Sequence, residues 1–246
     1  MFSKSHTKYI QSLHHKKFRD ELGVFIAEGP KLVEELLQAP GLVCKALFAL
    51  SAWLEANEQM VAKKNIETVF EVEDFELEKI SALATPHLVL AVFEQIFVET
   101  APALNGKISI ALDTMQDPGN LGTIIRIADW FGIENVICSI GSVDQYNPKV
   151  VQSTMGSLAR VNVIYVDLLS WLPEQKIPLY AAALNGKPIA ELGPIAEGIL
   201  LIGNESKGIH PALLDMVDEK ITIPKKGKAE SLNAAVATGI LVAHLT

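Results

Sequence analysis

The sequence predicts an α/β protein in which a small α/β domain precedes a larger domain built on a parallel sheet. From residue 107 onward, six short and almost continuously apolar runs alternate with stretches of helical spacing. Strands of this kind are buried on both faces, as in parallel sheets covered by helices. Residues 98–106 contain one Pro, one Gly and no periodicity, and they are the predicted linker. The 246 residues are enough for two domains, which we place at 1–100 and 105–246.

In the first domain, apolar spacing and turn residues predict alternating helices and strands. The first helix is expected over residues 4–18, with Gly23 as the stop signal that follows it. Gly29-Pro30 then marks the start of the second helix. The expected strands are 24–27, 42–50, 66–70 and 88–93, and the later helices are 30–38, 51–62 and 74–83.

In the second domain, the apolar runs define the expected strands. These runs are ISIALD, NVICSI, VNVIYV, PLYAAAL, GILLIG and KITIP. An Ala- and Val-rich helix over residues 231–244 ends the chain.

Composition excludes several classes of protein. No apolar run approaches the roughly 20 residues that a membrane-spanning helix needs. The N-terminus lacks the apolar region and the cleavage site of a secretory signal. Cys44 and Cys138 lie in apolar strands and are expected to be buried thiols rather than a disulfide. We therefore expect a cytoplasmic protein without a membrane segment, and without a metal site because Cys and His show no ligand spacing.

Charge is unevenly distributed along the chain. The net charge is −8, yet residues 1–19 hold five Lys and Arg residues, including Lys16, Lys17 and Arg19, and no acid. An acidic body disfavours non-specific binding to nucleic acid. A basic arm still permits a local phosphate contact, and the alternative is a solvated helix face.

Three polar loops follow predicted strands, at the sheet edge where ligands of open parallel sheets bind. In the loop 114–122, Asn120 is expected to cap a helix that carries Arg126 about one turn in. In the loop 203–208, two glycines flank an acid and suggest a backbone cradle, although neither a G-x-G-x-x-G nor a Walker A sequence is present. The loop 225–233 leads through Ser231 and Asn233 into a helix. Each loop alone fits an ordinary turn, and the coincidence of three in one sheet predicts a site.

These loops also carry a family resemblance. The segments DPGNLGTIIR (117–126), LIGNESKGI (201–209) and IPKKGKAESLNAAVATGI (223–240) resemble, in order and spacing, the three motifs of the SpoU/TrmH (SPOUT) class of S-adenosylmethionine-dependent RNA ribose 2'-O-methyltransferases. The segments KYIQSLHHKKFR and FIAEGPKLVEEL resemble the small RNA substrate-binding domain often fused ahead of it. The resemblance implies a trefoil knot, a homodimer with the terminal helix in its interface, and ribosomal or transfer RNA as substrate. Many relatives carry Arg where this chain has Gln152, so the identity of the substrate is not carried over.

The resemblance also implies cofactor contacts. They would come from backbone groups at Gly203, Ile223 and Leu232, with Leu184 as a further candidate. Apolar Ile and Leu suit the flat walls that an adenine ring needs.

For catalysis, the resemblance implies Arg126, Asn120, Glu205, Ser231 and Asn233. A guanidinium has a pKa above about 12 and offers only donors, so Arg126 suits stabilisation of a developing alkoxide and an adjacent phosphate better than proton removal. Asn120 would orient Arg126 or the ribose. Glu205 could anchor the loop, orient a partner or accept the proton, and Ser231 and Asn233 would complete the pocket.

Two other functions are alternatives to the methyltransferase. A catalytically silent RNA-binding or ribosome-assembly factor could keep the same fold, but it has no need of all five catalytic residues. A nucleotide-dependent dehydrogenase lacks its glycine fingerprint. We further expect the basic arm and the first domain to supply RNA affinity, while the second domain alone keeps its fold and cofactor pocket.

Overall fold

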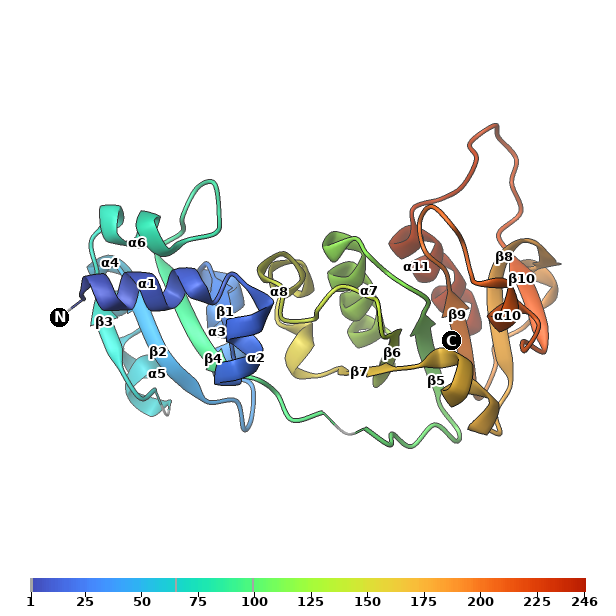
Figure 1. Cartoon of the computed structure of the whole chain (residues 1–246), viewed down its shortest axis with the longest axis horizontal. Coiled ribbons are helices and arrows are strands. Elements are labelled where there is room, and N and C mark those ends of the chain that lie inside the picture. The colour runs from blue at the N-terminus through green and yellow to red at the C-terminus, as the bar shows by residue number, and fades with distance from the viewer. Residues whose placement is uncertain (1, 65, 99) are drawn as a thin grey trace. The chain divides into compact units, whose positions relative to one another are not determined.

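The computed structural model describes residues 2–64, 66–98 and 100–246, and the chain forms two compact units (Figure 1). The first unit comprises Met1–Phe97 together with Asp144–Ala159, and the second comprises Val98–Val143 with Arg160–Thr246. Within the described ranges, no helix combines the length and apolar character that a membrane crossing requires.

A four-stranded sheet forms the centre of the first unit. Its strands are β1 (Val24–Glu28), β2 (Cys44–Ala49), β3 (Val69–Glu71) and β4 (Val89–Glu94), in the order β1-β4-β2-β3. β4 is antiparallel to both β1 and β2, whereas β3 is parallel to β2.

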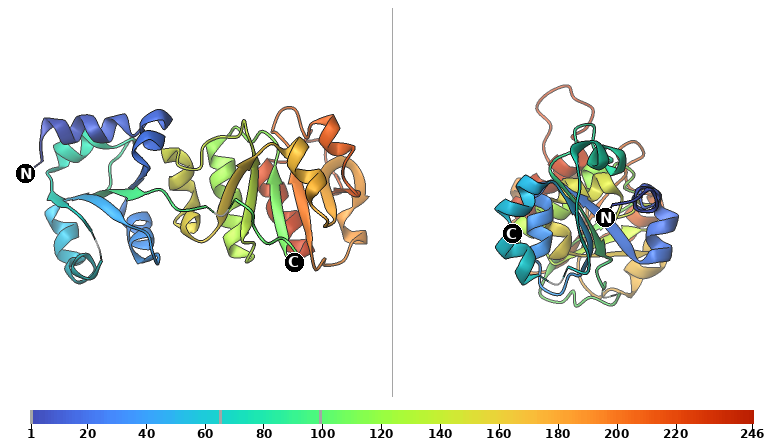
Figure 2. Two further views of the ribbon diagram at one scale, coloured as in Figure 1. Left: turned by 60° about the horizontal axis from the view of Figure 1, so that its bottom comes forward. Right: turned by 90° about the vertical axis from the view of Figure 1, so that its left-hand side faces the viewer.

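Helices cover both faces of this sheet (Figure 2). They are α1 (Lys4–Ser12), α2 (Lys16–Leu22), α3 (Pro30–Gln38), α4 (Ser51–Ala56), α5 (Glu58–Lys63), α6 (Asp74–Ile80) and α8 (Pro148–Thr154). Ile10 of α1 and Leu77 of α6 share one apolar cluster with Ile26 and Phe48 of the sheet. α3 packs against β1 and β4.

Two of the expected helices are broken in the structure. The helix expected over 4–18 is interrupted at residues 13–15, because His15 is extended and starts α2 as its N-cap. This turn lets both Leu13 and Arg19 enter the interior. The helix expected over 51–62 is interrupted at Asn57, whose side chain donates to the Trp53 carbonyl at 3.0 Å and so competes with helical hydrogen bonding.

The segment 144–159 completes the first unit, although the linear sequence placed it within the second domain. The ring of Tyr146 stacks on Phe25 with a centroid distance of 5.0 Å, and its hydroxyl donates to the Ile96 carbonyl at 3.2 Å. Burial raises the pKa of Tyr146 to about 12. At Gly156, with a φ of 92°, a Cβ would lie 2.2 Å from Cγ of Glu35, so only glycine allows this approach to α3.

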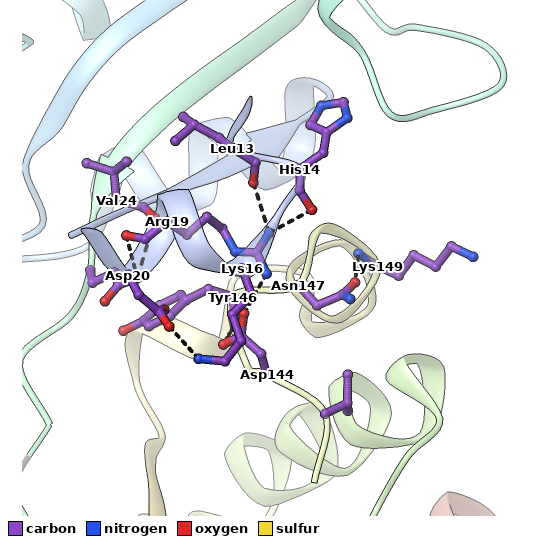
Figure 3. Close-up of polar contacts among 12 residues, drawn as sticks. Leu13, His14, Lys16, Arg19, Asp20, Val24, Asp144, Tyr146, Asn147 and Lys149 are labelled. Carbon is purple, nitrogen blue, oxygen red and sulfur yellow. Dashed lines mark hydrogen bonds and ion pairs between the residues drawn. The ribbon is translucent and has the colours of Figure 1, made fainter. Parts of the chain in front are cut away.

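Arg19 fixes this segment to α2 from the inside (Figure 3). Its side chain is only 2% exposed and donates to Asp144 Oδ2 at 2.6 Å and to the carbonyls of Leu13 and His14 at 2.8 and 3.0 Å. The expectation that Arg19 is a free cation of a basic arm is therefore wrong. Ile10 and Leu13 are buried as well, so residues 2–19 are part of the folded unit rather than a detachable arm.

The second unit contains the expected parallel sheet. Its six strands are β5 (Ile108–Leu112), β6 (Asn135–Ser139), β7 (Asn162–Val166), β8 (Leu179–Pro188), β9 (Gly198–Ile202) and β10 (Glu219–Thr222). Their order is β10-β8-β9-β5-β6-β7, and every neighbouring pair is parallel. The predicted linker before β5 is irregular, with Glu99 outside the described residues.

Among the described residues, four helices and two 3-10 turns accompany this sheet. The helices are α7 (Pro118–Trp130), α9 (Leu168–Trp171), α10 (Pro211–Leu214) and α11 (Ala234–Leu245), and the turns are Leu172–Glu174 and Ile189–Glu191. A further 3-10 turn, Ser157–Ala159, belongs to the first unit. α7 packs against α11, where a Cβ at Gly239 would lie 3.4 Å from Cδ1 of Ile127. The final helix starts at Ala234 rather than at Ser231, with Asn233 as its N-cap.

Both cysteines are buried free thiols, as predicted. Burial raises the pKa of Cys44 and of Cys138 to about 12, so both thiols are protonated and unreactive in the folded protein at neutral pH.

Replacing Asp144 with Asn should lower the free energy of unfolding by about 3 kcal/mol, because it leaves the charge of Arg19 buried without a counter-charge. Urea denaturation measures this change. Lys16→Gln is the matched control, because it breaks the exposed Lys16–Asp20 pair (2.6 Å), for which we expect less than about 1 kcal/mol. An Asp144→Asn protein as stable as the control would contradict the role given to this pair.

Candidate active site

The candidate site lies where two loops leave neighbouring strands of the second unit. β5 and β9 are parallel neighbours, with Leu112 opposite Ile202. From this pair, β6 and β7 continue on one side of the sheet and β8 and β10 on the other. Open α/β sheets bind ligands outside the carboxyl ends of their strands at such a reversal of strand order. The loops 113–117 and 203–210 both start there.

The first loop has an uncommon backbone conformation. Thr114 has a φ of 53°, which β-branched residues rarely adopt. Its N–H donates to Ser139 Oγ at 2.7 Å, and its hydroxyl donates to Asp113 Oδ1 at 2.8 Å. Conformations of this kind persist only where surrounding contacts determine them, and they gather at functional sites. The shape of this loop is therefore fixed by its neighbours.

The second loop closes on itself around Gly203. A Cβ at Gly203 would lie 2.3 Å from the carbonyl carbon of Gly208, so no side chain fits. Asn204 and Gly208 exchange two backbone hydrogen bonds of 3.0 and 2.9 Å. The Asn204 side chain accepts from the N–H groups of Ser206 and Lys207 and donates to the Thr114 carbonyl at 2.7 Å. Asn204 thus ties the two loops together.

Asn204 and Thr114 are functional positions that the motifs did not predict. An Asn directly after a loop glycine was the available signal for Asn204, because Asn side chains often bond the backbone two residues further on. The positive φ of Thr114 is accompanied by a hydrogen bond to Ser139, a residue distant in the sequence, so the local sequence contains no signal for it.

A chain of three side chains joins the three motif segments. Asn120 Nδ2 donates to Glu205 Oε1 at 2.9 Å, and Asn233 Nδ2 donates to Asn120 Oδ1 at 2.8 Å. Asn120 is buried, and its amide can donate and accept at the same time. Three of the five predicted catalytic residues are therefore in direct contact.

The starts of two helices hold this chain in place. Asp117 caps α7 by accepting from the Asn120 N–H at 2.7 Å, so the expectation that Asn120 itself is the cap is wrong. Asn233 caps α11 by accepting from the N–H groups of Ala235 and Val236 at 3.0 and 3.2 Å. Because capping fixes both backbones, the two Asn side chains need little further ordering.

The predicted cofactor residues lie in loops around the same edge. Leu184 belongs to residues 182–186, which bulge out of β8 where its pairing with β10 shifts register. Its side chain is 75% exposed, and its carbonyl accepts from Thr222 Oγ1 at 3.3 Å, next to Ile223. A Cβ at Gly186 would lie 2.5 Å from the backbone of Lys220, which makes this close approach possible only for glycine. Leu232 is half exposed in the loop before α11.

Both parts of the chain match known protein families. Residues 107–243 match the SpoU rRNA Methylase family, and residues 4–91 match the MRM3-like substrate binding domain. The chain belongs to the SpoU rRNA methylase family. It is 35% identical to the 23S rRNA (guanosine(2553)-2'-O)-methyltransferase RlmP of Bacillus subtilis, over 96% of this chain and 93% of that protein.

Solved structures of the same class resemble the whole chain. An AdoMet-bound rRNA methyltransferase from Sinorhizobium meliloti has a TM-score of 0.86 at 30% identity, covering 100% of this chain and 96% of that one. The SpoU methyltransferase AviRb from Streptomyces viridochromogenes, in complex with AdoMet, has a TM-score of 0.84 at 25% identity. The match covers 99% of this chain and 97% of that one.

Two of the residues predicted from the SpoU motifs stand apart from the chain of side chains. Ser231 lies in an exposed stretch, 224–233, that projects between β10 and α11 (Figure 1). Arg126 lies about two turns into α7 rather than one. Its exposed guanidinium has no hydrogen-bond or ion-pair partner within the part of the chain that the structure describes.

An apolar groove of about 730 Å³ lies elsewhere in the second unit. It is lined by Leu172, Ile177, Leu179 and Met216, at the amino end of β8. The SpoU motifs lie at the carboxyl ends of the strands, so this groove is not the candidate active site. Among the described residues, no cluster of three or more His, Cys, Asp or Glu side chains is arranged to hold a metal ion.

Replacing Asn120 with Asp should lower the free energy of unfolding by about 1–3 kcal/mol, because the amide donor is lost and a carboxylate oxygen faces Glu205. Thermal denaturation of the full chain measures the change. Asn185→Asp makes the same replacement on an exposed side chain, and we expect no more than about 0.5 kcal/mol there. Equal melting temperatures for the two variants would contradict the contact.

Proposed function

We propose that this chain transfers a methyl group from S-adenosylmethionine to a ribose 2'-hydroxyl of ribosomal RNA, with transfer RNA as the second substrate class. The observation that carries the proposal is Asn120, because its amide joins Glu205 and Asn233 and so brings one residue from each SpoU motif to one point. Relatives whose names give a 2'-O-methyltransferase activity on 23S rRNA, and which match almost the whole chain, support the reaction.

The residues around the sheet edge fit the cofactor. Leu184 and Leu232 leave large apolar surfaces in solvent beside polar backbone groups, a combination that suits an adenine ring. Gly203 lets the loop 203–208 close tightly on itself, because no side chain would fit against the Gly208 backbone. When bound, S-adenosylmethionine supplies a methyl group on a positively charged sulfur.

We assign the electrostatic role to Arg126. The ribose hydroxyl must lose its proton as the methyl group transfers, and negative charge develops on that oxygen. A guanidinium cannot accept the proton, but it can hold the neighbouring phosphate and stabilise this charge. Its guanidinium is exposed and has no partner among the described residues, which leaves its donors available to RNA.

For Glu205, three roles stay open. One carboxylate oxygen accepts from Asn120, which anchors the loop 203–208. The carboxylate can also orient the ribose or accept the hydroxyl proton. Ser231 and Leu232 directly precede Asn233 in the exposed stretch 224–233 and would complete the pocket.

Calorimetry with S-adenosylmethionine distinguishes the enzyme from a silent RNA-binding factor. We expect saturable heat, whereas no heat at millimolar cofactor would favour the silent factor. Mapping ribose methylation across total RNA, in cells with and without the protein, then identifies the nucleotide as the position that loses its mark.

Arg126→Ala should abolish methyl transfer to rRNA while leaving the affinity for S-adenosylmethionine nearly unchanged, because the residue is assigned to the hydroxyl and the phosphate. Radiolabelled methyl transfer and calorimetry measure the two quantities. Arg160→Ala removes another exposed arginine of the same unit, one that binds Asp129, and should keep turnover. Turnover of Arg126→Ala near the wild-type rate would refute the assignment.

We further propose that the first unit supplies most of the RNA affinity. Its match to a substrate-binding domain supports this role, as do the exposed Lys4, Lys8 and Lys17. Deletion of residues 1–19 does not test it, because the deletion also removes Ile10, Leu13 and Arg19 from the interior. Whether the second domain keeps its fold alone stays a prediction, as does the domain division at 100 and 105.

Three further expectations from the family remain proposals. These are the trefoil knot, which would be an exception to the general absence of knots in proteins, the homodimer and a cytoplasmic location. For the homodimer, the support is a group of exposed apolar side chains on the packed helices α7 and α11. Trp130 of α7 is 84% exposed, and Val236 and Ile240 of α11 are exposed at a spacing of one helical turn.

Val236→Glu should convert a dimer into a monomer, because it places a charge among these exposed apolar side chains. Sedimentation velocity at micromolar concentration measures the mass. Leu169→Glu makes the same change on α9, away from α7 and α11, and should leave the dimer intact. A monomeric wild-type protein would rule out the interface.

A further inference from the structure

An exposed aromatic side chain projects from α2 of the first unit. Phe18 is 38% exposed, and Leu22, one turn further along the helix, is exposed as well. The Lys17 ammonium lies 6.0 Å from the centroid of the Phe18 ring, at the limit of a cation–π contact. The imidazole of His15 meets the same ring edge to face at 6.5 Å. The ring is thus framed by a cation and an aromatic heterocycle.

The helix beneath this ring is rigidly held. Arg19, the next residue, points inward and is fixed by Asp144 and by two backbone carbonyls (Figure 3). Because Arg19 faces the interior, the backbone is oriented so that its neighbour Phe18 remains at the surface. An aromatic ring on a fixed support loses little conformational freedom when it binds a partner.

A second phenylalanine of the same unit offers a comparison. Phe75 of α6 is 55% exposed and has the ammonium of Lys79 at 4.7 Å from its ring. However, α6 carries Asp74, Glu76 and Glu78 against a single lysine, whereas on the surface of α2 two lysines balance two acids, Asp20 and Glu21. Phosphates would therefore be repelled near Phe75 more strongly than near Phe18. Charge therefore distinguishes two sites of otherwise similar chemistry.

We propose that Phe18, flanked by Lys17 and His15, is a stacking platform for an unpaired base of the RNA substrate. The inference rests on the proposed function and adds a place and a chemistry for RNA contact on the first unit. Aromatic side chains stack on any base because every base has a π-face, and the cation beside the ring would meet the adjacent phosphate.

The test uses the full chain and ribosomal RNA from cells that lack the protein, and it measures binding over a range of salt concentrations. Phe18→Leu keeps an apolar side chain but removes the ring, so we expect roughly tenfold weaker binding with an unchanged salt slope. Phe18→Trp should restore the affinity. Lys17→Gln should reduce the salt slope by about 0.7, because it removes one phosphate contact.

Phe75→Leu and Lys79→Gln are the matched controls and should bind RNA like the wild type. Since Phe18 is exposed, all variants should also melt like the wild type, which excludes unfolding as a cause. Wild-type RNA affinity in Phe18→Leu, or equal losses in Phe18→Leu and Phe75→Leu, would overturn the inference. If Phe18→Leu changes only self-association or protein binding, the surface around Phe18 is a protein-docking surface and the inference is wrong.

The same assay separates this inference from the proposed function. Wild-type methyl transfer to rRNA together with an unaffected Phe18→Leu variant refutes only the platform. A wild-type protein that neither binds nor methylates RNA refutes both.

Discussion

The parallel pairing of β5 with β9 is the constraint on which the candidate active site depends. These two strands are far apart in the sequence, yet their carboxyl ends meet at Leu112 and Ile202. The loops that follow can therefore be joined by single side chains, through Asn204 to Thr114 and through Glu205 to Asn120. A shift of β9 by one residue would reverse the faces of its side chains and separate these partners. The chemistry of the site thus rests on the register of a buried sheet.

In the first unit, a buried ion pair has the corresponding role. The pairing of Arg19 with Asp144 removes two charges from water, which is unfavourable unless hydrogen bonds compensate, and the two carbonyls that Arg19 also reaches provide part of that compensation. Its Nε atom still finds no partner among the residues that the structure describes. Such a contact determines where the segment 144–159 docks more than it adds to the free energy of folding, because the Asp144 carboxylate fits only beside the guanidinium. It makes a segment of the methyltransferase sequence, 144–159, a part of the first unit.

The sequence predicts the parallel sheet and the members of the site, but not the contacts between them or the break before α2. Continuous apolar runs predicted the parallel sheet, because strands buried on both faces need apolar side chains throughout. The chain Asn120–Glu205–Asn233 was predicted as a set by family motifs, but its contacts were not, since they depend on strand order. The break at residues 13–15 carries no Gly or Pro, and it allows both Leu13 and Arg19 to enter the interior. The sequence could not predict the role of Arg19, because its partner Asp144 lies 125 residues away.

The charge of the chain also limits how it can recognise RNA. With a net charge of −8, the protein as a whole repels phosphates at long range, so few cations can contribute to affinity. Stacking between a base and an aromatic ring is not a phosphate contact, and so it adds affinity without adding counterion release. Affinity that relies on stacking also favours unpaired bases over duplex RNA, whose bases are already stacked on one another. An acidic body with a small basic and aromatic surface therefore suits an enzyme that must ignore most RNA and bind one exposed nucleotide.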